Sequence, residues 1–234
     1  MKEIKFTLVQ PQLEYCAEFP SPAIKNLPEW YKNMPGFTNN KKEFSNGQLS
    51  ETVKKCIPVL DATSSGYIIK LWTDVYVEEK ENNISGIHTA TVNGEVLAVE
   101  GHNISQVSLY PFPHGYKKEV LKWTNPWHIK TPKGYSCWIT SPINHDIPFK
   151  TFDGVVDTDT FPLSINFPFL IRDNFFGTIP RGTPIAQVIP FKRDSFNATK
   201  GKFDKEEYQK LLNYHDTAFT NKYKVKWWSR KKYN

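Results

Sequence analysis

Three aspartates stand close together, at Asp153, Asp157 and Asp159. If the backbone is extended there, Asp157 and Asp159 point to the same face, because side chains alternate along a strand. Two neighbouring carboxylates can bind Mg²⁺ or activate a water molecule as a general base. Aspartate is also a common capping residue in turns. The spacing therefore makes Asp157 and Asp159 candidate catalytic residues, with a purely structural turn as the alternative.

The elements that must position these carboxylates lie within residues 152–191, where strand-like runs alternate with turns. The turn Pro180-Arg181-Gly182 predicts a hairpin between the runs on either side of it. A similar turn, Pro132-Lys133-Gly134, precedes a strand predicted over residues 135–140. The charged tips of these turns could meet phosphate groups, although exposed charges in turns are usually only solvated.

The rest of the chain predicts an all-β protein of the sandwich or barrel type, because short strand-like runs are separated by Gly, Pro and Asn turns. An Asn93-Gly94 pair predicts a two-residue hairpin between two of these runs. Helices are expected only over residues 204–218, in one turn at 27–32, and from Pro58 to Gly66. The other predicted strands cover residues 2–10, 67–78, 84–91, 96–100, 120–123 and 127–130.

We expect a single domain over residues 1–234. It would consist of a Pro-rich N-terminal arm (1–50), a β core (51–195) and a C-terminal appendage (196–234) with one helix and a basic, aromatic tail. No run of about 18 apolar residues predicts a membrane span, and the first residues do not resemble a signal peptide. Three cysteines and six histidines show no metal-binding spacing. The expectation is a cytoplasmic or virion-associated protein with no metal centre and no membrane contact.

The net charge of +6 comes entirely from the C-terminal tail. Residues 222–234 (KYKVKWWSRKKYN) contain six Lys and Arg and no acid, and without them the chain has 24 basic and 24 acidic residues. Lysines alternate with apolar residues over 222–227, a pattern that predicts a strand. We expect this strand to pair with the body or with a neighbouring subunit. Nucleic acid is the less favoured partner for the tail, and its binding would be sensitive to salt.

Several segments resemble motifs of the dUTP pyrophosphatase and dCTP deaminase families. In chain order these are residues 62–67 (ATSSGY), 154–159 (GVVDTD), 177–179 (GTI), 181–182 (RG) and 185–188 (IAQV). The resemblance implies a β-clip fold, a distorted β-barrel or sandwich that often forms trimers and binds nucleotides at subunit junctions. It also implies that Asp157 orients the attacking water, that Gln187 is the glutamine of the family motif, and that Mg²⁺ accompanies a triphosphate.

The chain departs from that family pattern at several positions. Thr160, followed by Phe161, stands where the family has the tyrosine that stacks on the sugar, and Ile68 replaces an aspartate. The phosphate-binding Arg-Ser-Gly segment would fall near Ser141, with no arginine there. The glycine-rich C-terminal arm is replaced by the basic, aromatic tail. The catalytic set is therefore incomplete, and whether the chain is an enzyme stays open.

The whole chain is also similar to an uncharacterised family that is common in phage genomes. The segments that carry this similarity are residues 27–31 (LPEWY), 60–62, 66–69, 125–136 (NPWHIKTPKGYS), 154–159 and 182–193 (GTPIAQVIPFKR). The similarity implies a viral or bacterial origin and no particular activity.

Together these observations predict a nucleotide-type binding protein or a divergent hydrolase that forms a homo-oligomer. The site would contain Asp157 and Asp159 as catalytic residues, and Gln187, Arg181, Phe161 and Ser141 as ligand-binding residues. Mg²⁺ is the one cofactor that such a site would use. The alternative is a non-enzymatic, virion-associated assembly protein that uses the fold for oligomerisation.

Overall fold

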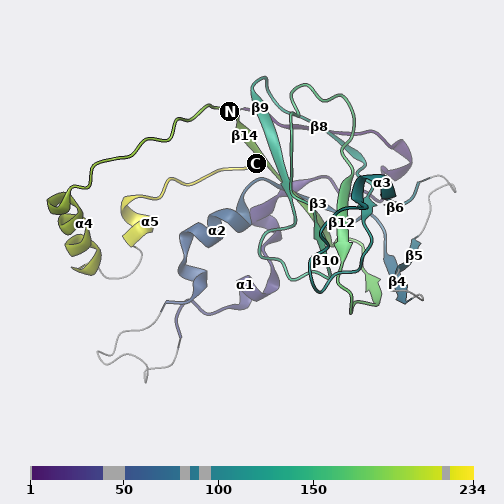
Figure 1. Cartoon of the computed structure of the whole chain (residues 1–234), viewed down its shortest axis with the longest axis horizontal. Helices are drawn as coiled ribbons and strands as arrows, with labels where there is room; N and C mark the ends of the chain where they lie inside the picture. The colour runs from purple at the N-terminus through teal and green to yellow at the C-terminus, as the bar shows by residue number, and fades with distance from the viewer. Residues whose placement is uncertain (1, 39–50, 80–84, 90–95, 218–221) are drawn as a thin grey trace.

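The computed structural model describes residues 2–38, 51–79, 85–89, 96–217 and 222–234, and most of its regular structure is β-strand (Figure 1). This confirms the expected all-β character. The strands are β1 (Lys5–Leu8), β2 (Ser21–Pro22), β3 (Tyr67–Lys70), β4 (Val75–Glu79), β5 (Ser85–Thr89), β6 (Val99–Gly101), β7 (Leu121–Trp123), β8 (Trp127–Lys130), β9 (Tyr135–Thr140), β10 (Phe149–Thr151), β11 (Gly154–Val156), β12 (Phe167–Ile171), β13 (Gly177–Ile179) and β14 (Pro184–Lys192).

These strands form antiparallel sheets in the orders β11-β9-β14-β3-β2, β10-β12-β7-β6, β13-β4-β5 and β1-β8. The buried core lies between them and takes apolar side chains from strands of every sheet. Trp123 of β7 stacks on Phe169 of β12 with 3.8 Å between the ring centroids, so aromatic rings fill much of the core volume. The N-terminal arm contributes to it as well, because β1 pairs with β8 and Leu13 is fully buried.

The long strand β14 organises the largest sheet. It pairs with β3 over Pro184–Val188 and with β9 over Gln187–Lys192. β11 pairs with the other edge of β9, with Val156 opposite Cys137. The C-terminal ends of β11 and β14 therefore meet the N-terminal end of β9, and the aspartate turn follows β11 at this place.

Two predicted hairpins are not confirmed. β13 and β14 flank the turn Pro180-Arg181-Gly182 but belong to different sheets, so this turn connects sheets rather than paired neighbours. β5 and β6 also belong to different sheets, and the predicted Asn93-Gly94 turn lies outside the described residues. The strand predicted over residues 67–78 is interrupted, because the chain leaves one sheet after β3 and enters another at β4.

The helices of the described chain are short except for one. They are α1 (Glu29–Asn33), α2 (Ile57–Ser64), α3 (Ile104–Val107), α4 (Lys205–Thr217) and α5 (Lys222–Lys226). The predicted positions of α1, α2 and α4 are confirmed. The strand predicted for the tail is wrong, since residues 222–226 form α5 and the chain then continues without regular structure. Within the described part of the chain, every helix is too short or too polar to cross a membrane.

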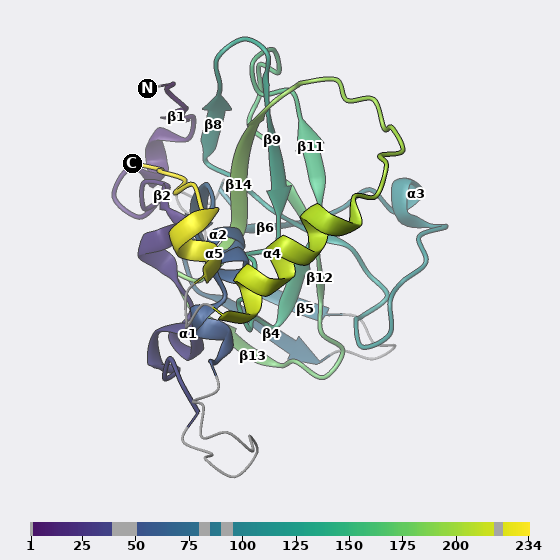
Figure 2. The same cartoon turned by 90° about the vertical axis from the view of Figure 1, so that its left-hand side faces the viewer.

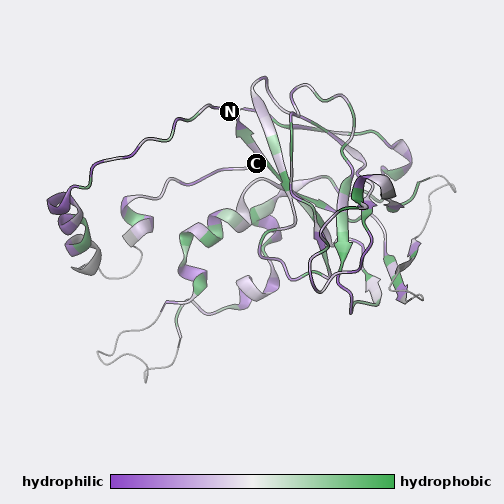
Figure 3. Cartoon of the chain, in the orientation of Figure 1, coloured by the Kyte–Doolittle hydropathy of each residue, from purple (hydrophilic) through white to green (hydrophobic). Residues whose placement is uncertain are grey.

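The C-terminal appendage leaves the body and returns to it. Residues 194–204 are exposed and extended, and they place α4 apart from the body, on the side where β9, β11 and β14 lie (Figures 1 and 2). This connecting segment is mostly hydrophilic, whereas α4 carries apolar residues among polar ones (Figure 3). After α5 the chain comes back to α2, where its last residues pack.

Candidate functional site

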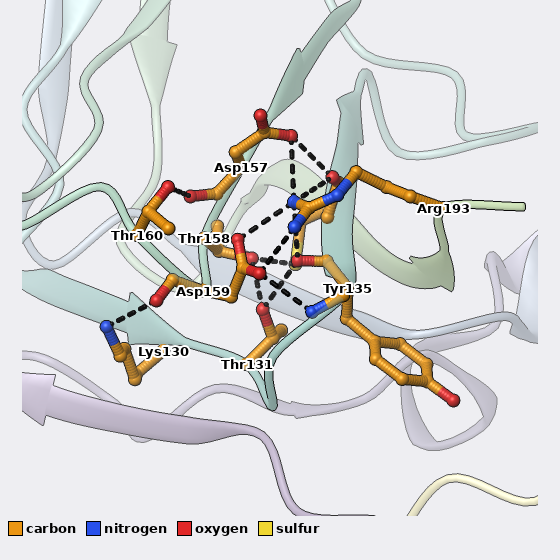
Figure 4. Close-up of polar contacts among 11 residues, drawn as sticks. Lys130, Thr131, Tyr135, Asp157, Thr158, Asp159, Thr160 and Arg193 are labelled. Carbon is orange, nitrogen blue, oxygen red and sulfur yellow. Dashed lines mark hydrogen bonds and ion pairs between the residues drawn. The ribbon is translucent and has the colours of Figure 1, made fainter.

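The aspartate turn is a tight loop that follows β11. The carbonyl oxygen of Asp157 accepts hydrogen bonds from the backbone N–H groups of Thr160 and Phe161, at 3.0 and 2.9 Å. This folds the chain back on itself, so that the two carboxylates face Arg193, which follows β14 (Figure 4). Residues 158–160 form a turn rather than a strand, so the alternation expected for an extended backbone does not apply, and the turn is what brings both carboxylates to Arg193.

Both oxygens of the Asp159 carboxylate are engaged. Arg193 binds them with its two terminal nitrogens, and the backbone N–H of Gly134 donates to Oδ2 at 2.8 Å. The side chain of Asp159 is only 2% exposed. The hydrogen bond from Arg193, together with that from Gly134, lowers the pKa of Asp159 to about 2. This carboxylate is therefore ionised and already saturated with donors.

Asp157 makes fewer contacts than Asp159. Its Oδ1 accepts a hydrogen bond from Ser136 Oγ at 2.6 Å and lies 3.1 Å from Arg193 Nη1. Its side chain is 61% exposed, so it still faces solvent. The hydrogen bond to Asp159 raises the pKa of Arg193, and the charge of Asp157 adds to this effect. We call Ser136, Asp157, Asp159 and Arg193 the aspartate cluster.

The aspartate cluster ties together the ends of three strands, β9, β11 and β14. The guanidinium of Arg193 binds Asp159 through both terminal nitrogens and also contacts Asp157, and such bidentate pairs are strong and directional. A Mg²⁺ ion would have to displace Arg193 from Asp159, so these residues do not favour a metal site. Among the residues that the structure describes, no group of three acidic, His or Cys side chains could hold a metal ion.

Gln187 lies in the middle of β14, and its side chain is fully buried. Its Oε1 accepts from the backbone N–H of Ile143 at 2.9 Å, and its Nε2 donates to the carbonyls of Ala62 and Ser65 at 3.1 and 2.7 Å. These bonds use the amide to join β14 to α2 and to the loop after β9. Gln187 is therefore not beside the aspartate cluster.

The other predicted ligand-binding residues are also dispersed. Ser141 exchanges hydrogen bonds with the backbone of Thr151. Arg181 precedes β14, whereas Arg193 follows it, so the two arginines lie at opposite ends of this strand. The side chain of Arg181 donates to the carbonyl of Cys16 at 3.0 Å. Only Phe161 is close to the aspartates, in the same turn and half exposed. The structure brings together Asp157, Asp159 and Phe161 but not Gln187, Ser141 or Arg181.

Two neighbouring cavities lie elsewhere, between α2 and the C-terminal segment. Their volumes are about 510 and 380 Å³, and both are lined by Leu60 and Lys224, so the two cavities adjoin at these residues. We call them together the basic groove. The basic side chains that line it are Lys54, Lys55, Lys224, Arg230, Lys231 and Lys232.

Of the side chains that the structure describes, Asp61 of α2 is the one acidic side chain that lines the groove, and it is already paired. Its carboxylate accepts two hydrogen bonds from Trp228 Nε1, at 3.1 and 2.9 Å, and lies 2.6 Å from Lys231 Nζ. This bond raises the pKa of Lys231. Among the described residues, no acidic side chain forms an ion pair with the other five basic residues.

The sequence contained only weak signals for these two regions. Arg193 ends the segment GTPIAQVIPFKR, but its role depends on the register between β14 and β9, which the sequence does not show. The basic residues of the tail were noticed, whereas Lys54 and Lys55 were not connected with them. A signal for Asp61 was present, since it is the one charged residue in α2 (IPVLDATS).

Comparison of the chain with protein-family models, with curated proteins and with solved structures found no significant match. Conclusions about function therefore rest on the residues and geometry described above.

Proposed function

We propose that the chain binds a phosphate-bearing, nucleotide-type ligand, and that it does so in the basic groove. The observation that carries this proposal is the excess of positive charge there: six basic side chains surround two cavities whose acidic residue is already bonded to Lys231 and Trp228. The larger cavity, about 510 Å³, is within the usual range for small-molecule sites. Phosphate groups supply the charge that would balance these side chains.

Aromatic rings in the larger cavity suit the base of a nucleotide. Trp228 and Tyr233 both line it. The ring of Trp228 is oriented by its hydrogen bonds to Asp61, and the ring of Tyr233 packs edge-on against Tyr67 at 5.9 Å. Fixed rings beside cations are a common arrangement for a ligand that carries both a base and phosphates.

The test is calorimetric titration and thermal unfolding with deoxynucleoside triphosphates. A ligand present at one hundred times its Kd stabilises the folded state by about 2.7 kcal/mol, which corresponds to a rise in Tm of roughly 5–10 °C. We expect this rise in the wild type and its loss in the double variant Arg230→Glu/Lys232→Glu. The control is Lys200→Glu/Lys202→Glu, which makes the same charge change in the exposed connecting segment. No rise with any nucleotide would contradict the proposal.

A β-clip fold of the dUTP pyrophosphatase type is part of this proposal. It is supported by the mostly antiparallel β architecture and by the order of the motifs at residues 62–67, 154–159 and 185–188. Hydrolysis is not part of it, because Arg193 occupies the aspartates. If the protein does hydrolyse a nucleotide, Asp157→Asn should abolish the activity without lowering Tm, and that result would restore the aspartate turn as an active site.

A second candidate function, self-assembly, is favoured by one specific observation. Tyr208, Leu211 and Leu212 of α4 are exposed at helical spacing, and α4 stands apart from its own body (Figure 1). Trp138 and Val155, which are paired across β9 and β11, are also exposed. A second copy of the chain could cover both surfaces by placing its α4 on this sheet face.

Mass measurement by light scattering during size-exclusion chromatography tests the assembly role. We expect an oligomer for the wild type and a monomer for Leu211→Asp/Leu212→Asp. Gln209→Asp on the same helix is the control and should leave the mass unchanged. A monomeric wild type at all concentrations would contradict this function.

A further inference from the structure

We infer that the ligand of the basic groove is a single-stranded nucleic acid, which runs along α2 and occupies both cavities. This inference rests on the proposed function and specifies its ligand class. It places successive phosphates along the row of basic side chains and bases on the exposed rings of the C-terminal segment.

The first argument is the extent of the positive charge. The larger cavity has Arg230, Lys231 and Lys232, and the smaller one has Lys54 and Lys55, with Lys224 shared by both. A mononucleotide has all its phosphates in one place and would leave the second group of lysines unused. A polynucleotide carries one phosphate per residue and supplies negative charge along the whole groove.

The second argument is the way in which distant segments of the chain converge on this row. Lys54 and Lys55 belong to the short 3-10 helix Val53–Lys55 that leads into α2, whereas the other basic residues follow α4. Lys54 Nζ donates to the carbonyl of Lys32 at 2.6 Å, and Lys55 Nζ lies over the ring of Phe37 at 4.9 Å. These contacts fix the positions of both lysines but leave their charges uncompensated by carboxylates.

The third argument concerns the rings and favours a single strand over a duplex. Tyr223 and Trp227 are exposed on α5 and on the residue after it, in the same C-terminal segment as Trp228 and Tyr233, which line the larger cavity. Lys224 lies 6.0 Å from the ring of Trp228, so cations and rings alternate along this segment. Unpaired bases can stack on such rings, whereas the bases of a duplex are already stacked on one another. Because every base has a stacking face, we expect little dependence on sequence.

Fluorescence anisotropy with a labelled oligothymidine of about 20 nucleotides, longer than the site of a typical single-strand binding fold, tests the inference. Thymidine triphosphate and a duplex of the same length are the comparison ligands. We expect the oligothymidine to bind at least about tenfold more tightly than either, with an affinity that falls steeply as salt is raised.

Two double variants separate the cavities. Lys54→Glu/Lys55→Glu should weaken oligothymidine binding by about tenfold or more and leave thymidine triphosphate binding unchanged, because only the oligothymidine is long enough to reach the smaller cavity. Arg230→Glu/Lys232→Glu should weaken both ligands. Lys200→Glu/Lys202→Glu should affect neither. If the Lys54/Lys55 variant has a lowered Tm, Lys55→Gln replaces it, and the expected result is a smaller salt dependence of oligothymidine binding.

The outcomes distinguish this inference from the proposed function. If thymidine triphosphate binds as tightly as the oligothymidine, or if the Lys54/Lys55 variant weakens both ligands equally, the inference of a single-stranded nucleic acid ligand is wrong. The proposed nucleotide site in the basic groove then remains. Equal binding of the duplex would contradict the stacking argument and with it the single strand. If neither ligand binds, both proposals are wrong.

Discussion

The aspartate cluster and the basic groove are both highly charged, but their charges are compensated to different extents. In the aspartate cluster, Arg193 pairs with Asp159 through both nitrogens and also contacts Asp157, and Gly134 and Ser136 supply further donors to the two carboxylates. In the basic groove, the described lining holds six basic side chains and one acidic side chain, Asp61. A charged group that is fully paired inside the protein has little left to offer a ligand. The comparison therefore favours a structural role for Asp159 and supports the proposal that a ligand binds at the groove.

The two regions are nevertheless connected through β14. Arg193 follows its C-terminal end, while Gln187 and the backbone near Val188 hold α2, which forms one wall of the groove. Variants along this connection test whether α2 is held in place by β14. Variants in the aspartate cluster and in the basic groove test whether the first region stabilises the fold and the second binds a ligand.

The largest effect is expected from Gly66→Ala, at the junction between α2 and β3. Gly66 has φ +71°, and a Cβ there would lie 2.1 Å from the carbonyl oxygen of Val188. The left-handed backbone and the clash with backbone atoms together should lower the free energy of unfolding by about 3 kcal/mol or more. Denaturant unfolding measures this loss.

Gly101→Ala is the matched control for Gly66, because a Cβ at Gly101 meets nothing within 4 Å. It should change the stability by no more than about 0.5 kcal/mol. Equal stability of Gly66→Ala and the wild type would show that α2 is not held against β14 as described.

The next largest effect is expected from Gln187→Leu. The substitution leaves the N–H of Ile143 and the carbonyls of Ala62 and Ser65 without their partner. We expect a loss of about 2–4 kcal/mol in the free energy of unfolding, because buried polar groups would be left unsatisfied. Gln106→Leu on the exposed side of α3 is the control. If Gln187→Leu instead keeps the stability and loses the ligand, Gln187 has the binding role that the family resemblance implies.

Gln187, expected to bind a ligand but found buried under α2, illustrates what the sequence can and cannot predict. Local patterns located single elements well: β9 was predicted over residues 135–140, and Gly66 was recognised as the residue that ends α2. Which strands pair is a non-local property: the hairpin expected around Arg181 was wrong, and β5 pairs with β4 among the described residues, while the expected Asn93-Gly94 turn lies outside them. A motif such as IAQV shows that a glutamine is present in a strand, but not whether α2 will cover it.

The same reasoning explains the two sites. Asp157 and Asp159 were found because they are close in sequence. Arg193, which determines their chemistry, is separated from them by more than thirty residues and is brought back by β14. The basic groove requires Lys54 and Lys55 to line a cavity together with Lys224, and no local pattern predicts that arrangement. The alternation in the tail even predicted a strand where α5 forms.

Arg193→Ala should have a smaller but clear effect, and it tests the structural role of the aspartate cluster directly. It removes the bidentate partner of Asp159, whose carboxylate is almost fully covered, and leaves that charge unpaired. We expect Tm to fall by several degrees. Arg172→Ala is the control, since its pair with Asp146 is exposed on both sides and such pairs contribute little.

The pH dependence of this effect follows from the lowered pKa of Asp159. Its folded-state pKa of about 2 is below the ordinary value of 3.8, so its stabilising contribution is present above about pH 4 and is lost as the pH falls towards 2. The difference in Tm between the wild type and Asp159→Asn should therefore be largest near neutral pH and shrink as the pH falls from about 4 through 2. A difference that does not change with pH would contradict the ion pair as its origin.

The smallest effect on stability, and the sharpest test of the groove, is expected from Asp61→Asn. Asp61 holds the C-terminal segment through Trp228 and Lys231, and its side chain is 17% exposed. The amide removes the charge that attracts Lys231 but keeps an acceptor for Trp228, so the body should remain folded while the segment opens more often. Trypsin should then cleave within residues 224–232 several-fold faster than in the wild type, with Asp146→Asn as the control. An unchanged cleavage rate would mean that other contacts hold this side of the groove. The bond from the Tyr67 hydroxyl to the carbonyl of Asn234 would then be the next one to remove.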